Sequence, residues 1–193
     1  ISNNAVYPDS NNCRGTANIP LGVTSIGFRA FYNVPLSGIT IPSTVTSIAL
    51  SPDSKQILSG SDDYTLKVWD LKSGQEIHTL KGHFSSVNSV DFSSNGKQVL
   101  SGSESGLMKL WDINTGKELV SMVSSSDGEW VTITPDGYFD ASQNGAQMLN
   151  VRIGNEVFSM DNFYDTFYRP DIVRARINGQ DVSNMVTADI RSI

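Results

Sequence analysis

The 193-residue chain has a single cysteine, Cys13, and only two histidines. One cysteine excludes an internal disulfide and any zinc site that is built on several cysteines. No apolar run approaches the roughly 18 residues that a membrane-spanning helix needs, and the first residues show no signal-peptide pattern. The net charge is −6, and the sequence contains no cluster of basic residues. We therefore expect neither a membrane nor a nucleic acid as a partner.

The patterns of common catalytic sites are also missing. The string GSESG, at Gly102–Gly106, has Glu104 where a nucleophile elbow needs serine, and no helix pattern follows it. The sequence contains no glycine-rich phosphate loop, no carboxylate pair at a catalytic spacing and no Cys/His dyad. We expect no enzymatic activity, no cofactor and no metal site in this chain.

The chain is 38% apolar, which is enough for a hydrophobic core. It begins at Ile1 rather than at methionine, and this favours a piece of a longer protein. The cellular compartment therefore stays open. All lysines lie between Lys55 and Lys117 and all arginines lie outside that interval, which indicates segments of different composition.

A short repeat marks the first segment. The string IPLGVTSI at Ile19–Ile26 recurs as IPSTVTSI at Ile41–Ile48. The sequence distance from Ile19 to Ile41 suits one coil of a leucine-rich-repeat solenoid. The sequence of this short repeat resembles the BspA-like leucine-rich repeats of bacterial and protist surface proteins. We expect residues 1–44 to be a remnant of such a repeat.

A long repeat occupies residues 45–122. Val45–Ile77 recurs as Val87–Leu119, and a Trp-Asp pair falls in register in both copies. Apolar strings separated by Pro-Asp-Ser, Asn-Gly and Ser-Gly turns predict four short strands in each copy. With Gly82-His83 between the copies, the pattern resembles the WD-repeat β-propeller family. That resemblance implies two blades of four antiparallel strands.

Residues 123–193 begin like a third blade and then depart from the pattern. WVTITPDGYFDAS predicts a strand, a tight turn and a strand, but no Trp-Asp pair follows. DNFYDTFY predicts a short helix with Asp161 as its N-cap, and a second short helix is expected after Arg169-Pro170, with Asp171 as its cap. The string TPDGYFDAS…VRIGNEV…FYRPDIV resembles the segment that follows the last WD blade in some bacterial proteins.

WD blades commonly contain a hydrogen-bonded chain of a tryptophan, a serine or threonine, a turn aspartate and the histidine of the Gly-His pair. The resemblance implies an incomplete chain in each copy, because Ile41 replaces the first histidine and Ser105 the second aspartate. The residues expected in this structural network are Ser61, Asp63, Trp69, His83, Ser103 and Trp111. Tyr168 and Arg169, beside the aromatic helix, either contact a partner or attach this helix to the last blade.

Together these patterns predict a mainly β chain. We expect an incomplete β-propeller of two to three four-stranded antiparallel blades, preceded by a short leucine-rich-repeat piece and followed by two short helices. The expected function is a non-catalytic protein–protein interaction or scaffold module from a larger bacterial protein. Two alternatives stay open: the regulatory portion of a caspase-like peptidase whose catalytic domain lies outside this chain, and an extracellular adhesion piece. The identity of the protein partner is unknown, and open strand edges favour self-association.

Overall fold

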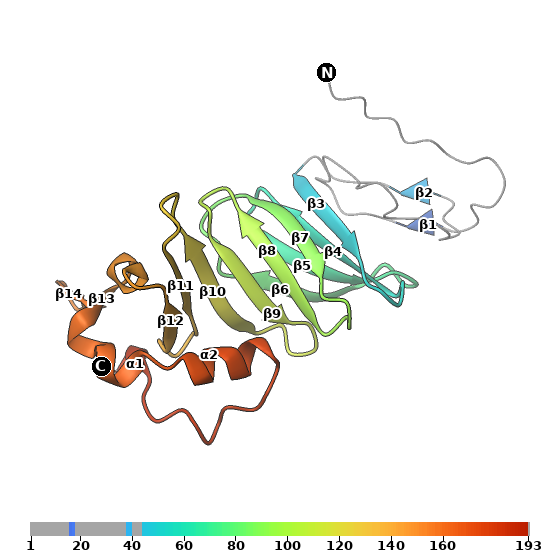
Figure 1. The fold of residues 1–193 in the computed structure, drawn as a ribbon. Coiled ribbons are helices and arrows are strands. Elements are labelled where there is room, and N and C mark those ends of the chain that lie inside the picture. Colours follow the sequence, from blue (N-terminus) through green and yellow to red (C-terminus); the bar gives the residue numbers. More distant parts are fainter. Residues whose placement is uncertain (1–15, 18–37, 40–43, 193) are drawn as a thin grey trace. The chain divides into compact units, whose positions relative to one another are not determined.

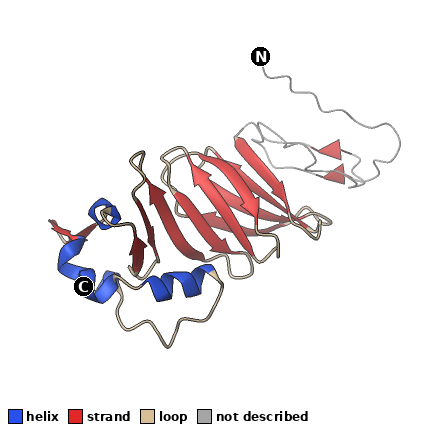
Figure 2. Cartoon of the chain, in the orientation of Figure 1, coloured by secondary structure: helices blue, strands red, loops and turns tan. Residues whose placement is uncertain are grey.

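The protein is described by a computed structural model that covers residues 16–17, 38–39 and 44–192. The chain divides into two compact units, residues 1–105 and 106–193. Strands dominate the regular structure, and all described helices lie in the second unit (Figure 1, Figure 2). These features confirm the prediction of a mainly β chain with antiparallel sheets and two short α-helices.

The first unit contains a four-stranded antiparallel sheet and the antiparallel pair of β7 with β8. The sheet has the order β3-β4-β5-β6. Each strand corresponds to one that the long repeat predicts. The strands are β3 (Val45–Leu50), β4 (Gln56–Ser61), β5 (Thr65–Asp70), β6 (Glu76–Lys81), β7 (Val87–Phe92) and β8 (Gln98–Ser103).

Serine side chains shape the first turn of each copy of the long repeat. The hydroxyl of Ser51 accepts hydrogen bonds from the backbone N–H groups of Lys55 and Gln56, at 3.2 and 2.9 Å. In the second copy, Ser93 Oγ accepts the equivalent bond from the N–H of Gln98 at 3.0 Å. The same side-chain chemistry at equivalent positions explains why both copies form the same first hairpin.

Strand β7 packs against β3 and β4 of the first sheet. Val87 and Val90, which are 0% and 7% exposed, lie over Gly60. A Cβ atom at Gly60 would lie 2.9 Å from Cγ1 of Val87, so only glycine allows this approach. The N–H of Val90 donates to Ser47 Oγ at 3.2 Å, and the hydroxyl of Thr46 donates to the carbonyl of Val87. The second repeat is thus joined to the first by packing and by hydrogen bonds.

Two short parallel strands precede the blades: β1 (Thr16–Ala17) and β2 (Gly38–Ile39). Thr16 is the partner of Gly38, and these two residues are as far apart in the sequence as Ile19 and Ile41 of the short repeat. Successive coils of a solenoid pair equivalent positions in this way. Most of residues 1–44, including Cys13 and Ile41, lies outside the described residues.

The second unit contains an antiparallel meander, a small hairpin and the helices. The meander has the order β9-β10-β11-β12, and β13 pairs with β14. The strands are β9 (Met108–Asp112), β10 (Glu118–Ser124), β11 (Trp130–Ile133), β12 (Phe139–Ala141), β13 (Asn150–Ile153) and β14 (Glu156–Ser159). The helices are η1 (Gly145–Met148), η2 (Met160–Phe163), α1 (Tyr164–Phe167), α2 (Pro170–Ile177) and η3 (Ile190–Ser192).

The hairpin predicted for a third blade forms, but it extends the sheet of β9 and β10 because β11 pairs directly with β10. The loop sequence explains this. In the loop before β7, Gly82 has a φ of +149° and His83 is buried at 6% exposure, whereas the loop before β11 is a tight turn. In that turn the N–H of Ser125 donates to the carbonyl of Glu129 at 2.9 Å, and Gly128 takes a φ of +89°. A tight turn returns the chain beside the strand it has just left.

The first predicted helix begins with a different cap from the one expected. The side chain of Ser159, not that of Asp161, caps η2, because Ser159 Oγ accepts the N–H of Asp161. Serine is as effective as aspartate at this position, since either side chain offers an oxygen to an unpaired backbone N–H. The helical segment therefore starts at Met160, with Asp161 in its first turn.

The second predicted helix, α2, begins at Pro170, whose fixed φ and missing N–H suit the first helical position. The N-cap residue is Arg169, and no side chain caps this helix. The expected cap, Asp171, lies in the first turn instead, where its negative charge is favourable. Gly179, with a φ of +69°, follows the end of α2.

The core of the second unit joins the meander to the helices, and α2 packs against β10 and β12 (Figure 1). Tyr168 forms a parallel bridge with Phe139, and the N–H of Arg169 donates to the Phe139 carbonyl at 3.0 Å. This segment covers the outer edge of β12, an edge that would otherwise present unpaired backbone groups. The buried core residues are Val131, Tyr138, Phe139, Ala146, Val151, Met160, Phe167, Ile172, Ala175 and Val182.

Candidate functional site

Trp69 is at the centre of the network in the first repeat. Its indole Nε1 donates a hydrogen bond to Ser59 Oγ at 3.0 Å, whereas the sequence-based expectation named Ser61. In the register of β4 and β5, Trp69 lies opposite Ile57, so Ser59 is its diagonal neighbour and Ser61 lies farther along the strand. An aromatic side chain reaches a diagonal neighbour at about 7–8 Å. The serine that bonds the tryptophan is therefore two positions upstream of the expected one.

Ser61 and Asp63 instead form the turn that joins β4 to β5. Ser61 Oγ accepts the N–H of Asp63 at 3.2 Å, and the Asp63 carboxylate accepts the N–H and hydroxyl of Thr65 at 2.9 and 2.7 Å. Burial alone would raise the pKa of Asp63, but the hydrogen bonds from Thr65 and Ser61 outweigh it and hold that pKa below its usual range. The side chains of Ser61 and Asp63 thus find hydrogen-bond donors within their own turn.

His83 anchors the loop between the repeats. It is 6% exposed, and its Nε2 lies 2.7 Å from Oγ of Ser101, which is fully buried. Ser101 is the counterpart of Ser59 in the long repeat, so this serine position serves the network in both copies. Ser103, the serine expected here, lies 3.0 Å from the hydroxyl of Ser105 at the surface. Trp111 is buried in the second unit, at 2% exposure.

A second repeated contact was not foreseen from the sequence. Lys67 pairs with Glu76 at 2.6 Å, and its ammonium lies 5.3 Å from the centre of the Trp69 ring. Lys109 and Glu118 form the counterpart pair, also at 2.6 Å, with the ammonium 5.8 Å from the Trp111 ring. A lysine two positions before each tryptophan and a glutamate seven positions after it were the available signal.

Tyr168 and Arg169 attach the helical segment to the meander. The Tyr168 ring stacks on Tyr164, with centroids 4.6 Å apart, and lies 5.5 Å from the ring of Phe139. The Arg169 guanidinium donates to both carboxylate oxygens of Asp171, at 2.8 and 2.6 Å. Both residues thus have partners inside the second unit, which favours the attachment role over contact with a partner protein.

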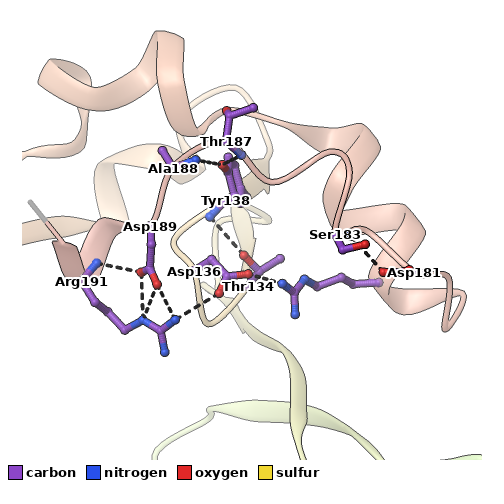
Figure 3. Close-up of polar contacts among 10 residues, drawn as sticks. Thr134, Asp136, Tyr138, Asp181, Ser183, Thr187, Ala188, Asp189 and Arg191 are labelled. Atoms are coloured by element: carbon purple, nitrogen blue, oxygen red, sulfur yellow. Dashed lines mark hydrogen bonds and ion pairs between the residues drawn. The ribbon is translucent and has the colours of Figure 1, made fainter.

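A clasp around the TPDG turn was not predicted (Figure 3). The Tyr138 hydroxyl accepts the backbone N–H groups of Thr187 and Ala188, at 2.8 and 2.6 Å. The carboxylate of Asp136 accepts from Arg176 on α2 and, at 3.2 Å, from Arg191. We call residues 181–192 the tail strap, because these contacts hold it against the turn.

A surface cavity of about 420 Å³ lies beside the clasp, between α2, β10 and the tail strap. Asp136 and Arg176 line it together with the apolar side chains of Val182 and Val186. Asp136 and Arg176 are paired with each other. Asp181, the third charged residue of the lining, accepts the N–H of Ser183 at 2.9 Å. All three side chains are engaged within the second unit, so the cavity by itself identifies no ligand class.

Among the described residues, no group of three or more histidine, cysteine, aspartate or glutamate side chains is arranged to hold a metal ion. Within the same residues, no helix has the length and apolar character to cross a membrane.

Comparison with known families identifies the repeats. The family model described as WD domain, G-beta repeat (WD40) matches residues 36–70 and 74–112. The chain contains two WD repeats. The first match starts before residue 45, where the sequence pattern placed the boundary with the leucine-rich-repeat segment.

Curated relatives share the WD repeats over short stretches. The human (Homo sapiens) serine-threonine kinase receptor-associated protein is 33% identical over 61 residues, which cover 31% of this chain and 17% of the relative. The mouse (Mus musculus) dynein assembly factor with WD repeat domains 1 is 49% identical over 39 residues, which cover 20% of this chain and 9% of the relative. The matched part thus spans less than a fifth of each relative. WD-repeat proteins are typically non-catalytic interaction scaffolds.

Solved structures show a partial similarity. The structures of U3-55K and of the RRP9 WD40 repeats each align with a TM-score of 0.42 and 23% identity. Each alignment covers 51% of this chain, together with 35% and 34% of the respective structure. The assignment of WD repeats rests on the sequence match.

Proposed function

We propose that this chain is a non-catalytic protein-interaction module of a larger bacterial scaffold protein. The observation that carries the proposal is the pair of WD repeats, because such repeats generally bind other proteins. One scaffold of this kind serves many partners through loops that vary independently of the blades. The partner's identity is therefore decided by exposed loop residues rather than by the strands.

Phe84 is the exposed residue that best suits partner contact in the first unit. Its side chain is 83% exposed, yet it directly follows His83, which is buried and anchored on Ser101. A large aromatic side chain on an anchored loop loses little conformational freedom on binding, and aromatic residues dominate interface energetics. Phe84 is thus a rigidly presented apolar contact.

The test is a binding titration with purified components. The chain is used to capture a partner, and calorimetry then measures direct binding of the purified partner to the chain. Phe84→Ser should weaken binding by about tenfold or more. Tyr64→Ser is the control, because Tyr64 is also exposed, at 49%, but lies on a different turn. Turnover of a peptide, ester or phosphate substrate that is lost on substituting one residue of this chain would overturn the proposal.

We also propose that residues 1–44 are a BspA-like leucine-rich-repeat remnant. The parallel pairing of Thr16 with Gly38 supports this, because its spacing equals that of the short repeat. Deleting residues 1–35, which precede the first WD-repeat match, should leave the far-ultraviolet circular dichroism signal and the unfolding of the WD repeats largely unchanged. Loss of cooperative unfolding in the truncated chain would contradict an independent remnant.

A second candidate is the regulatory portion of a caspase-like peptidase. The observation that favours it is the direct contact between two parts of the resembling string: Tyr168 of FYRPDIV bridges Phe139 of TPDGYFDAS. The deciding measurement is the full open reading frame that contains this chain. Absence of a peptidase domain from that frame would remove this candidate and leave the interaction module unaffected.

A further inference from the structure

The TPDG turn, Thr134–Gly137, differs from its counterparts in how it uses its acidic side chain. In the two WD repeats the residues at the equivalent turn position are Asp53 and Asn95. Asp53 Oδ1 accepts the N–H of Lys55 at 3.1 Å, and Asn95 Oδ1 accepts the N–H of Lys97 at 2.9 Å. In both repeats the side-chain oxygen thus serves its own turn.

In the TPDG turn a different side chain has this local role. The N–H of Tyr138 donates to Oγ1 of Thr134 at 3.1 Å. The carboxylate of Asp136 accepts instead from Arg176 on α2 and, at 3.2 Å, from Arg191 of the tail strap (Figure 3). A charge-assisted bond between a guanidinium and a carboxylate is stronger than a bond between neutral groups. The acidic side chain of this turn therefore binds groups that lie outside the turn.

The backbone of the tail strap is bound as that of a peptide ligand would be. The N–H groups of Thr187 and Ala188 donate to the Tyr138 hydroxyl, at 2.8 and 2.6 Å. The N–H of Ile190 donates to the backbone carbonyl of Asp136 at 2.9 Å. Every residue except proline has a backbone N–H. These three bonds therefore hold a segment in place without selecting its side chains.

Two neighbouring side chains of the strap make the selective contacts. Ile190 packs on Gly137, whose φ is +96°, and a Cβ at Gly137 would lie 2.6 Å from the Cβ of Ile190. Only glycine leaves room for this contact. Arg191 pairs with Asp136 through a side chain that is 64% exposed. The contacts of this turn thus match an aliphatic residue that is followed by arginine.

We propose that the TPDG turn is a recognition site for a protein segment with an aliphatic residue followed by arginine, and that the tail strap closes this site as an intramolecular ligand. A partner protein that carries such a pair displaces the strap and binds in its place. The strap therefore has an autoinhibitory role. This inference deepens the proposed interaction function and rests on it.

A second copy of this chain is disfavoured as the occupant, because its strap is tethered beside its own turn. Only residues 178–180 separate the end of α2 from the strap. A short tether holds a ligand at an effective concentration on the order of millimolar. At micromolar protein concentration the contact within one chain is therefore favoured over exchange between copies. A partner displaces the strap only by binding the turn more tightly than the strap does.

The first test is a titration of a fluorescein-labelled peptide of residues 184–192, followed by fluorescence anisotropy. The released chain is the full chain with Ile190→Asp and Arg191→Glu, which prevent its own strap from occupying the turn. It should bind the peptide saturably. The wild-type chain should bind about tenfold more weakly, because its tethered strap competes. A thermal melt of the released chain checks that it remains folded.

Peptide variants test the recognised pair on the same released chain. Ile190→Ser and Arg191→Gln in the peptide should each weaken binding by about fivefold or more, since one removes the apolar contact and the other the ion pair. Asn184→Asp is the matched control for charge: Asn184 is exposed and precedes the contacts with the turn. In the released chain, Tyr138→Phe should also weaken binding, because two backbone donors lose their acceptor.

Hydrogen exchange of the wild-type chain gives a second test that needs no variant to fold. The amides of Thr187, Ala188 and Ile190 should exchange through a local opening of the strap. The free energy of this opening should be lower than that for the amide of Val131, which is 2% exposed in β11. Exchange of the three strap amides only through global unfolding would show that the strap does not leave the turn, and would overturn the inference.

The peptide titration has further outcomes that overturn the inference. One is failure of a folded released chain to bind the peptide at millimolar concentration, and another is equal binding by the released and wild-type chains. A dimer in sedimentation velocity that the two strap substitutions disperse would assign the site to a second copy. In each case a partner whose binding depends on Phe84 in the first unit would still support the proposed function, so the two failures are distinguishable.

Discussion

Gly60 and Gly102 are identical residues at equivalent positions, yet their surroundings give them different roles. At Gly60 a methyl group would press against Val87 and Val90, and at Gly102 it would meet only Ser89 at van der Waals distance. Glycine otherwise weakens a strand by roughly 0.5–1 kcal/mol relative to alanine. Whether alanine stabilises or destabilises the protein at each of these two positions therefore depends on the space available for its methyl group.

We predict that Gly60→Ala lowers the free energy of unfolding by about 1–3 kcal/mol, because β7 must move away from β4 to admit the methyl group. Gly102→Ala should be neutral or slightly stabilising. Urea unfolding followed by circular dichroism measures both values. Equal destabilisation by the two substitutions would contradict the close approach of β7 at Gly60.

A second prediction at the scale of single residues concerns the serine that bonds Trp69. Ser59→Ala should lower the free energy of unfolding by about 1 kcal/mol, since it removes the acceptor of the indole N–H. It should also shift the indole N–H resonance of Trp69 in the proton–nitrogen NMR spectrum. Ser61→Ala is the control: a shift of that resonance in this variant, and not in Ser59→Ala, would restore the sequence-based assignment.

The tail strap is held against the meander in part by the hydroxyl of one buried tyrosine. Tyr138 is fully buried, and its hydroxyl accepts the N–H groups of Thr187 and Ala188, at 2.8 and 2.6 Å. Tyr138→Phe should cost about 1–3 kcal/mol, because two backbone donors lose their acceptor. Hydrogen exchange of these two amides should accelerate. Tyr164→Phe is the control, and unchanged exchange in Tyr138→Phe would contradict the clasp.

Acid should release the end of the same strap. Hydrogen bonds from the side chain and the backbone of Arg191 lower the pKa of Asp189 from 3.8 to about 2. A lowered folded-state pKa stabilises the docked strap above pH 3.8, and this contribution is lost as the pH falls through about 2. Pepsin cleavage within the strap should therefore accelerate across this interval more in wild type than in Asp189→Asn. An identical pH profile in the two chains would contradict the role of Asp189.

At the scale of the whole molecule, open strand edges predict association. Strand β6 is the last strand of its sheet, so one row of its backbone groups has no partner within that sheet. We expect the isolated chain to self-associate, and sedimentation velocity over a range of concentrations measures this. A monodisperse monomer with a cooperative melt would contradict the prediction. The covered edge of β12 shows that the second unit protects one edge with its own chain.

The sequence predicted the strands well because they are encoded locally. The alternation of apolar residues and the turn chemistry of Ser51 and Ser93 act over a few residues, and they recur with the period of the long repeat. The network was predicted less accurately, since the choice between Ser59 and Ser61 depends on the strand register. The clasp was missed because Tyr138 and Ala188 are far apart in the sequence, and no local pattern links them.

The sequence by itself determined that residues 36–70 and 74–112 are WD repeats, because periodicity and turn residues are properties of short stretches. Only the tertiary structure decided where the hairpin after β10 pairs, which serine bonds Trp69, and which repeat face is covered. These outcomes depend on register, loop direction and packing between distant residues. Leu58 and Leu100 illustrate the limit: equivalent leucines in matching strings become one buried side chain and one exposed one.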